Sequence, residues 1–470
     1  MIFKDILFNK KICIESFFVI FAFFFGVMLI FLTPPLQSPD EPAHFSRAYS
    51  VSEGHFIAKK MNNVSGDYVP LSLFKFENSV GYLTFKSNER ISYDILKKSS
   101  LIALEKENKV FGDQKYQALY SAISYLPQSI GIFIFRHFID SVYWILIGGK
   151  LFLLIFYIVC GVISIKSIPF LKELLFLVLL MPMSLSLGAS VSADGVLISL
   201  SILYISKIIE YSFSSKKLNS KQYLFLLSMA LLIALVKQSF FISLFILFLP
   251  MEKLCEIRFP SCFNNNFSKI TAIVLPAFLI GLFWSKISYN IFVPLNGSNP
   301  SIQLLFILSH PFVYLHTLFY TLYLNFLILI YETIGILGWL DVFLFPITYW
   351  LYFFFLFLNT FVGYSLNQKF ESSSYQKLFL FIYVVFNVIF TSTAIYLSWI
   401  RPYVISPFEG LQGRYFIPFV LPFFVLLFLL FNSFRSIFRF KYIFVFNIVL
   451  VILTYLNLVF GLYIRYYANF

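Results

Sequence analysis

Two adjacent acids follow the first long apolar run of the sequence, in the segment Ser38 to Tyr49. A serine followed by a proline is typical of a helix start, so Asp40 and Glu41 are expected in the first turn of a helix. His44 and Arg47 follow at spacings that place them on the same helix face as Asp40. Two acids, a histidine and an arginine together suit general-base catalysis or the binding of Mg²⁺ or Mn²⁺. The alternative is a helix whose acids only stabilise the positive end of its dipole.

Two further charges stand inside otherwise apolar sequence. Asp194 lies between two apolar runs, where it could serve simply as the N-cap of the second. Lys237 interrupts an apolar run, and because an ammonium in a membrane is costly, it is expected to face a cavity or a partner. Lys150 and Lys286 are similar, although their long side chains can also reach the nearer membrane surface.

A third polar motif precedes a late apolar run. Gln412 lies between two glycines, and Arg414 and Tyr415 follow the second glycine. Arginine suits the bidentate recognition of phosphate, and glycines allow a ligand to approach the backbone closely. The alternative is an arginine that anchors a helix end at the membrane surface with the help of its tyrosine neighbour.

The composition indicates that the elements holding these residues are membrane helices. The chain is 60% hydrophobic and 12% charged, whereas soluble domains carry about 25% charged residues. Apolar runs such as Ile14 to Phe31 have the length that crosses a hydrocarbon layer of roughly 30 Å. A β-barrel is excluded because its strands would alternate apolar and polar residues. The predicted class is an all-α polytopic membrane protein.

Basic residues predict the orientation of the chain. The net charge of +13 is explained by lysines and arginines in short cytoplasmic segments, so the lipid bilayer is the expected partner and nucleic acid is not. This rule places the N-terminus in the cytoplasm and the C-terminus outside, with about eleven crossings. The basic residues at the two ends that support this are Lys4, Lys10, Lys11, Arg435, Arg439 and Lys441.

Three regions follow from this topology: residues 1–33 with the first helix, a large extracytoplasmic loop at 34–140, and a multi-span domain at 141–470. The stretch Tyr116 to Phe138 is predicted to lie in the membrane interface, because a crossing there would reverse every later loop. Residues 173–190 are predicted to form one span.

Residues 222–250 are too long for one untilted crossing and short for two. With two crossings, Pro311 to Tyr331 would lie along the outer surface. With one, that stretch would itself be a crossing.

The predicted topology brings three polar segments to the same external side: Ser38 to Glu53, the tip at Asp194, and Arg401 to Arg414. A site built from them would face away from the cytoplasm. It could not use ATP or nucleotide-activated donors directly.

Between Pro39 and Ala48 the sequence resembles the GT-C superfamily of membrane glycosyltransferases that use lipid-phosphate sugars. More closely, it resembles a bacterial membrane family known as domain of unknown function 2142. The resemblance continues through several later motifs: Ser192-Ala193-Asp194, Lys237, Gly335 to Asp341, and Gln412 to Tyr415.

The resemblance implies an inverting glycosyltransferase of the bacterial cytoplasmic membrane. Such an enzyme moves a sugar from a polyprenyl-phosphate donor to a cell-surface glycan on the extracytoplasmic side. Asp40 would be the catalytic base, supported by Glu41, and the second acid of such sites would correspond to Asp194. Mg²⁺ or Mn²⁺, if used, would bind Asp40 and Asp194, although the sequence contains no Asp-x-Asp motif.

Lys237 and Arg414 are predicted to hold the donor phosphate. The other residues predicted to bind substrate are His44, Arg47, Asp194, Gln412 and Tyr415. Two other functions stay open: a polysaccharide polymerase or ligase, and a flippase or transporter of lipid-linked glycans. A transporter is expected to show internal repeats with paired broken helices.

Overall fold

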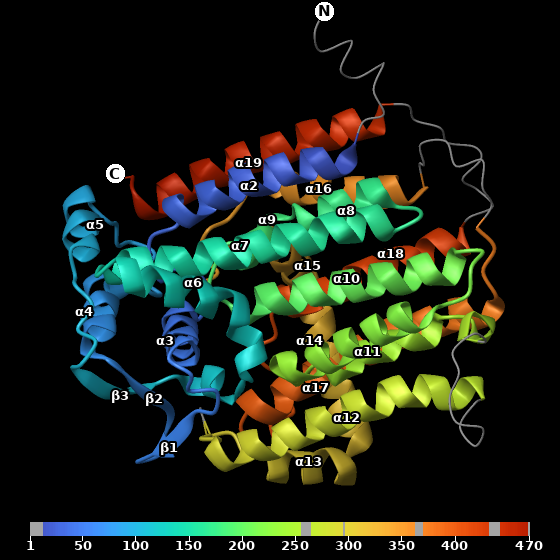
Figure 1. Cartoon of the computed structure of the whole chain (residues 1–470), viewed down its shortest axis with the longest axis horizontal. Coiled ribbons are helices and arrows are strands. Elements are labelled where there is room, and N and C mark those ends of the chain that lie inside the picture. Colours follow the sequence, from blue (N-terminus) through green and yellow to red (C-terminus); the bar gives the residue numbers. More distant parts are fainter. Residues whose placement is uncertain (1–12, 255–264, 295–296, 362–369, 432–441, 469–470) are drawn as a thin grey trace, which may run out of the picture.

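The computed structural model of the chain describes residues 13–254, 265–294, 297–361, 370–431 and 442–468. Eight helices among these residues are long and apolar enough to cross a membrane, and most of them run side by side with roughly parallel axes (Figure 1). The terminal basic residues used for the predicted topology lie outside the described residues. The eight are α2 (Ile14–Leu32), α7 (Val142–Ser167), α10 (Ala193–Phe213), α11 (Ser220–Leu235) with its following turn η4 (Val236–Gln238), α12 (Asn266–Ile291), α17 (Ser374–Trp399), α18 (Ile417–Leu430) with its preceding turn η8 (Gly413–Phe416), and α19 (Ile443–Tyr466).

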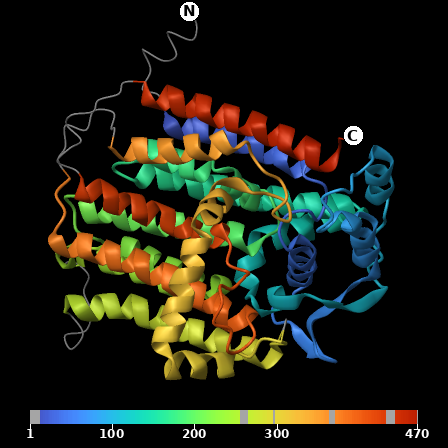
Figure 2. The same cartoon turned by 180° about the vertical axis from the view of Figure 1, so that it is seen from behind.

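The helical polytopic class is thereby confirmed, while the total of eleven crossings stays a prediction. A ninth span would come from α13 (Pro300–Ser309) and α14 (Pro311–Leu324), which meet at 108°. In Figure 2, α14 runs across the bundle and not along it. It is followed by two shorter apolar helices, α15 (Phe326–Gly335) and α16 (Pro346–Phe361).

The span predicted over residues 173–190 is not one continuous helix. The segment forms two short helices, α8 (Lys172–Leu179) and α9 (Pro182–Gly188). Met181 takes an extended conformation, with φ −54° and ψ 134°. This is the conformation that a following proline imposes, so Pro182 ends one helix and opens the next.

Residues 222–250 form two antiparallel passes, one of the two alternatives that the sequence left open. Helix α11 leads into the turn η4, and the chain returns through η5 (Phe240–Phe248) and η6 (Met251–Leu254), both 3₁₀ segments. The backbone N–H of Leu218 donates to the carbonyl of Lys253 at 2.8 Å, which closes the hairpin at its base. Lys237 and Gln238 have φ of 50° and 57° and lie at the tip of the hairpin.

The loop at 34–140 contains a sheet, so the all-α prediction is wrong in this region. Its three antiparallel strands are β1 (Lys59–Met61), β2 (Val64–Pro70) and β3 (Lys109–Asp113), in the order β1-β2-β3. The loop covers one end of the bundle (Figure 1). Its helices are α3 (Glu41–Ser52), α4 (Leu71–Val80), η1 (Gly81–Leu83), α5 (Tyr93–Ser100), η2 (Lys115–Leu119), η3 (Ala122–Tyr125) and α6 (Leu126–Phe138).

Helix α6 falls in the stretch predicted to lie in the interface. Its 13 residues span roughly 20 Å at 1.5 Å per residue, less than a crossing requires. It packs instead along α7, where Gly131 lies against the backbone of Gly148 so closely that a side chain at position 131 would collide with it.

The ends of distant helices meet this loop. The carbonyl of Ile291, at the end of α12, accepts a hydrogen bond from Ser65 of β2. The backbone N–H of Ile91 donates to the carbonyl of Tyr466, the last residue of α19, at 2.8 Å. The C-terminal ends of α12 and α19 therefore share one end of the bundle with the loop, as the alternative with two crossings at 222–250 requires.

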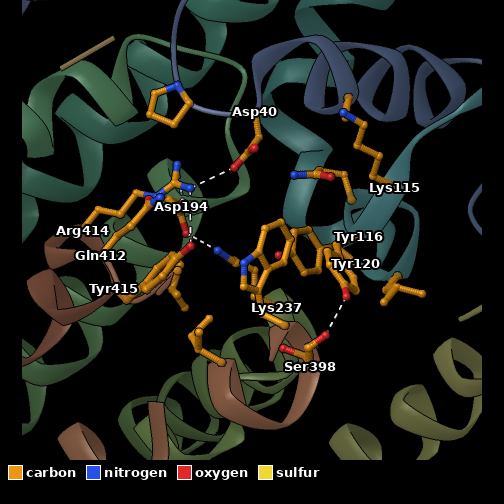
Figure 3. Close-up of a pocket in the computed structure, with 18 of the residues that line it drawn as sticks. Asp40, Lys115, Tyr116, Tyr120, Asp194, Lys237, Ser398, Gln412, Arg414 and Tyr415 are labelled. Carbon is orange, nitrogen blue, oxygen red and sulfur yellow. Dashed lines mark hydrogen bonds and ion pairs between the residues drawn. The ribbon is translucent and has the colours of Figure 1, made fainter. Parts of the chain in front are cut away.

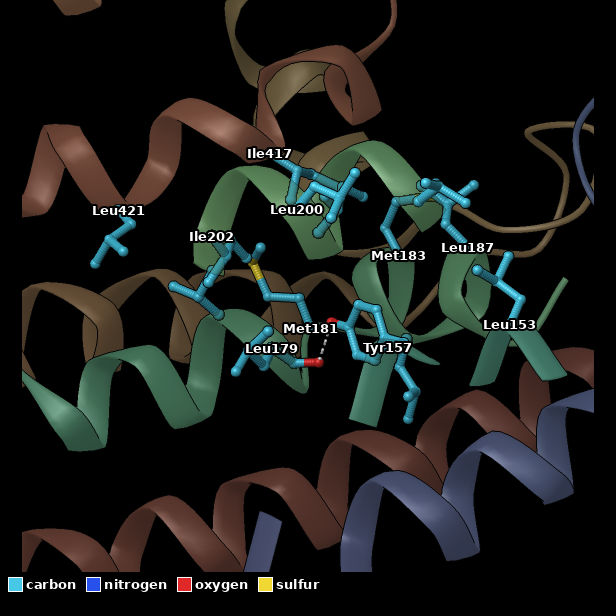
Figure 4. Close-up of a cluster of buried hydrophobic side chains, with 14 of the residues drawn as sticks. Leu153, Tyr157, Leu179, Met181, Met183, Leu187, Leu200, Ile202, Ile417 and Leu421 are labelled. Carbon is cyan, nitrogen blue, oxygen red and sulfur yellow. Dashed lines mark hydrogen bonds between the residues drawn. The ribbon is translucent and has the colours of Figure 1, made fainter. Parts of the chain in front are cut away.

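A buried apolar cluster fixes α10 and α18, two of the helices that begin at this end of the bundle (Figure 4). Leu200 of α10 and Ile417 of α18 lie with residues of α7, α8 and α9 in a continuous core. Within it, the hydroxyl of Tyr157 donates to the carbonyl of Leu179 at 2.7 Å, because the break after α8 leaves helix carbonyls without helical partners. The beginnings of α10 and α18 are thus held on packed, buried supports.

Candidate functional site

A cavity of about 1180 Å³ lies where the loop meets the helix ends. Part of its wall is polar and comes from the loop, while apolar side chains of the membrane helices form another part. Its main contributions come from residues 36–43, 77–85, 115–120, 194–198, 237–242, 338–340, 391–399 and 410–419.

Asp40 lies in this cavity at the N-cap of α3. Its φ of 56° is in the left-handed region, which aspartate tolerates better than most residues. One carboxylate oxygen, Oδ2, accepts a hydrogen bond from Nη2 of Arg414 at 2.9 Å. The side chain is still 43% exposed, so a ligand in the cavity can reach the carboxylate.

Asp194 lies in the first turn of α10, where the helix dipole stabilises a negative charge. Its Oδ1 is 2.5 Å from Nζ of Lys237, and its Oδ2 is 3.8 Å from Nη1 of Arg414. Figure 3 shows the resulting alternation of acid and base. We call Asp40, Arg414, Asp194 and Lys237, in this spatial order, the charge chain.

Two tyrosine rings hold the cations of the charge chain in place. Nζ of Lys237 lies 5.2 Å from the ring centroid of Tyr120 and 5.4 Å from that of Tyr415. The guanidinium of Arg414 lies 5.3 Å from the Tyr415 centroid. These are cation–π distances, so the aromatic rings fix both cations without neutralising their charge.

The charge chain leaves hydrogen-bonding capacity unused. Nε and Nη1 of Arg414 are buried and have no hydrogen-bond partner among the described residues, and the same holds for Oε1 of Gln412. Leaving such groups unpaired costs free energy. An anionic oxygen placed in the cavity would pair with the guanidinium donors, and phosphate oxygens fit them well.

The ionisation state of the two groups at the start of α3 follows from their surroundings. Burial raises the pKa of Asp40, but the nearby charges of Arg414, the larger influence, and Lys237 outweigh it and hold the pKa below its ordinary value. Burial lowers the pKa of His44 to about 4. At neutral pH, Asp40 is therefore a carboxylate and His44 an uncharged imidazole.

The structure places three of the predicted site residues outside the cavity. His44 is buried, and its Nδ1 lies 2.8 Å from the hydroxyl of Tyr125. Arg47 is fully buried and donates to the backbone carbonyls of His55 at 2.9 Å and Phe56 at 2.7 Å, which fixes the chain leaving α3. Glu41 also faces away from the cavity.

Glu41 forms a buried ion pair with Lys150 of α7. The two side chains are 3.1 Å apart and each is 1% exposed. This pair explains the lysine within an apolar run and binds the loop to the first helix after it. Lys286, the other lysine noted within an apolar run, is exposed on α12.

Glu41→Gln is expected to destabilise the protein, because it leaves the Lys150 ammonium buried without its counter-charge. Breaking a buried ion pair on one side costs about 3–5 kcal/mol. A thermal unfolding scan of the protein in detergent measures the effect. The double variant Glu41→Gln/Lys150→Met should recover most of the loss, and Glu105→Gln, in an exposed pair with Lys75, should change nothing measurable. An unchanged unfolding temperature for Glu41→Gln would contradict the structural role.

Several cavity residues were not predicted from the sequence. Lys115 has a φ of 49° and lies in a loop of mixed charge, where no pattern distinguishes it from its neighbours. Tyr120 and Trp339 line the cavity as well. Trp339 belongs to the motif Gly335 to Asp341. The sequence showed this motif as part of the family resemblance, but it did not predict that Trp339 lines the cavity.

Comparison with known proteins adds the family. The sequence model of the family described as "Predicted membrane protein (DUF2142)" matches residues 23–423. The chain belongs to this family. The match begins within α2 and ends within α18, so it includes all four residues of the charge chain. No curated protein and no solved structure matches the chain.

The donor groups of this DUF2142 protein do not fit a divalent metal. No group of three or more histidines, cysteines and acids that could hold a metal occurs among the described residues. Asp40 and Asp194, the two ligands predicted for Mg²⁺ or Mn²⁺, already pair with Arg414 and Lys237. A divalent ion between them would stand beside two fixed positive charges.

Proposed function

We propose that this DUF2142 protein is a membrane glycosyltransferase that transfers a sugar from a polyprenyl-phosphate donor to a cell-surface glycan with inversion at the anomeric carbon. The observation that carries this proposal is the charge chain. It places a guanidinium with buried, unpaired donors and an accessible carboxylate in the wall of one cavity. A phosphate-linked substrate and a hydroxyl nucleophile need these two kinds of group side by side.

The walls of the cavity suit a substrate with a lipid tail. Ligands with an apolar tail and a charged head need apolar side chains beside a small number of placed polar groups. The apolar part of the wall comes from membrane-spanning helices and from η5, beside Lys237. The contributing side chains include Leu197, Ile198, Phe241, Ile242, Ile395 and Phe419.

The proposed reaction assigns a role to each member of the charge chain. Asp40 accepts the proton of the acceptor hydroxyl while the acceptor oxygen bonds to the anomeric carbon. The bond from that carbon to the phosphate oxygen breaks, and the polyprenyl phosphate leaves with the electron pair. Arg414 and Lys237 stabilise the charge that grows on the phosphate. Asp194 holds both cations in position.

The composition of the cell envelope tests this function. Cells without the protein should accumulate a polyprenyl-phosphate sugar and lack that sugar in their surface glycan, and the wild-type chain should restore both. If the protein were a polymerase or ligase, its loss would instead change the length or the attachment of the glycan. If the protein were a flippase, cells without it would retain the lipid-linked sugar on the cytoplasmic leaflet. An unchanged set of lipid-linked sugars and an unchanged surface glycan would contradict all three functions.

The site is proposed to face the extracytoplasmic side of the cytoplasmic membrane, with the N-terminus inside. Single cysteines at Ser87 and Ser406, both exposed at the loop end of the bundle, should then react with an impermeant thiol reagent in intact cells. The background carries no other cysteine. A cysteine at Ser215, exposed at the opposite end, should react only after the cells are opened. Labelling of Ser215→Cys alone in intact cells would reverse the orientation.

A further inference from the structure

The cavity contains an aromatic pair that the charge chain does not use. The rings of Phe85 and Trp339 lie 4.8 Å apart between centroids, at an angle of 58°, and both line the cavity. Phe85 comes from the loop after η1, and Trp339 from the turn after α15. Residues far apart in the sequence thus meet at this wall.

Phe85 combines an exposed ring with a strained backbone. Its side chain is 75% exposed, although burying an aromatic ring from water is favourable. Its φ is 58°, in the left-handed region that bulky residues adopt only when the surroundings impose it. Backbone strain of this kind costs about 1–3 kcal/mol and is concentrated at ligand-binding sites.

The two loops that carry the aromatic pair are tied together by one arginine. Arg465, near the end of α19, donates to the carbonyls of Leu83 and Glu89, each at 2.9 Å, on either side of Phe85. Its Nε also donates to Asp341 at 2.5 Å, and Asp341 accepts the backbone N–H of Trp339 at 3.0 Å. The aromatic pair is therefore held in place before any ligand binds.

The remaining polar group of the aromatic pair is an unused donor. The indole N–H of Trp339 is buried and has no hydrogen-bond partner among the described residues. A ligand for this wall should combine an apolar face, which stacks on aromatic rings, with a nearby hydroxyl that accepts a hydrogen bond. A pyranose ring has both features, since its C–H groups form apolar faces and hydroxyls surround its edge.

We propose that Phe85 and Trp339 form the binding platform for the acceptor saccharide, an assignment that rests on the proposed function. The exposure of Phe85 places the platform where a glycan arriving from water meets the cavity. The charge chain remains available for the donor phosphate. Sugar binding at this wall then rests on ring stacking and one N–H donor.

Binding to the full chain in detergent tests the platform without any transfer reaction. The probe is a set of fluorescently labelled oligosaccharides released from the surface glycan of the cells that make the protein. Phe85→Leu keeps an apolar side chain but removes the ring, and Trp339→Ala removes the ring and the donor. Each variant should weaken binding about tenfold or more. Trp350→Ala is the matched control, because Trp350 is 47% exposed on α16 and does not line the cavity.

Wild-type affinity in both platform variants would overturn the assignment, as would a wild-type chain that binds none of the oligosaccharides. Equal affinity in Phe85→Leu alone would show that Phe85 only contacts lipid, and it would also overturn the paired platform. The result is separable from the proposed reaction. If Asp40→Asn transferred sugar normally while the platform variants lost binding, the platform would stand and the assignment of the base would fall.

Discussion

Asp40→Asn is expected to reduce sugar transfer by about 10²- to 10⁴-fold, the usual contribution of a positioned general base. The variant keeps the size and most of the hydrogen bonding of the side chain, and Asp40 is 43% exposed, so folding should not suffer. The measurement is the transfer rate at saturating donor in reconstituted membranes, together with the unfolding temperature. The rate should fall while the unfolding temperature stays at the wild-type value.

The neighbouring acid supplies the control. Glu41→Gln/Lys150→Met removes the other half of the acidic pair together with its buried partner, and it should retain the transfer rate per folded molecule. If this double variant were as inactive as Asp40→Asn, Glu41 would have a chemical role that its burial does not suggest. Near-normal transfer by Asp40→Asn would remove Asp40 from the mechanism.

The pH dependence of transfer follows from the same carboxylate. A general base acts in its deprotonated form, so activity is present above its pKa and is lost as the pH falls through that value. The pKa of Asp40 is held below its ordinary value, so the rate should stay constant from neutral pH down into the range in which ordinary carboxylates protonate. Because Arg414 is the largest of the lowering influences, its removal should move the acid limb of the profile to higher pH.

The charged members of the site could be predicted from the sequence because ionisable groups are conspicuous in apolar surroundings. Asp194, Lys237 and Arg414 each interrupt or border an apolar run, and the structure brings them together with Asp40. Their partners could not be predicted. Helical spacing placed Arg47 on the face of Asp40, but nothing in that spacing reveals that its donors bind backbone carbonyls of the same loop.

The same limit explains which parts of the fold stayed open and which were wrong. Hydropathy measures the length of an apolar run and not the path of the chain, so a hairpin at 222–250 and a single long helix look alike. Lys237 was the residue that marked the turn, but from the sequence it was interpreted as a charge inside the membrane. Pro182 was visible in the predicted span at 173–190, but prolines are common in membrane helices. The sheet around β2 was not predicted, because short strands in a loop of mixed charge show no sustained alternation of apolar and polar residues.

Arg414→Lys is expected to reduce transfer by about 10²- to 10³-fold, as the loss of one oriented donor does in other sites that stabilise growing negative charge. The guanidinium bonds Asp40 through Nη2, lies 3.8 Å from Asp194 through Nη1, and stacks on Tyr415. Its planar fork still leaves Nε and Nη1 for the phosphate. A lysine ammonium is a single point charge on a flexible stem and cannot occupy all these positions together.

The rate against donor concentration separates this role from anchoring at the membrane surface. An anchoring arginine could be replaced by lysine without loss, because lysine also reaches the interface. Arg401→Lys, on an exposed part of the preceding loop, tests that substitution where no ligand is proposed, and it should keep wild-type kinetics. Wild-type kinetics in Arg414→Lys as well would show that the donor phosphate binds elsewhere. Lys150 is paired with Glu41, and Lys286 is exposed on α12. The phosphate would then bind to Lys237 and to Lys115, the other cation among the described residues that line the cavity.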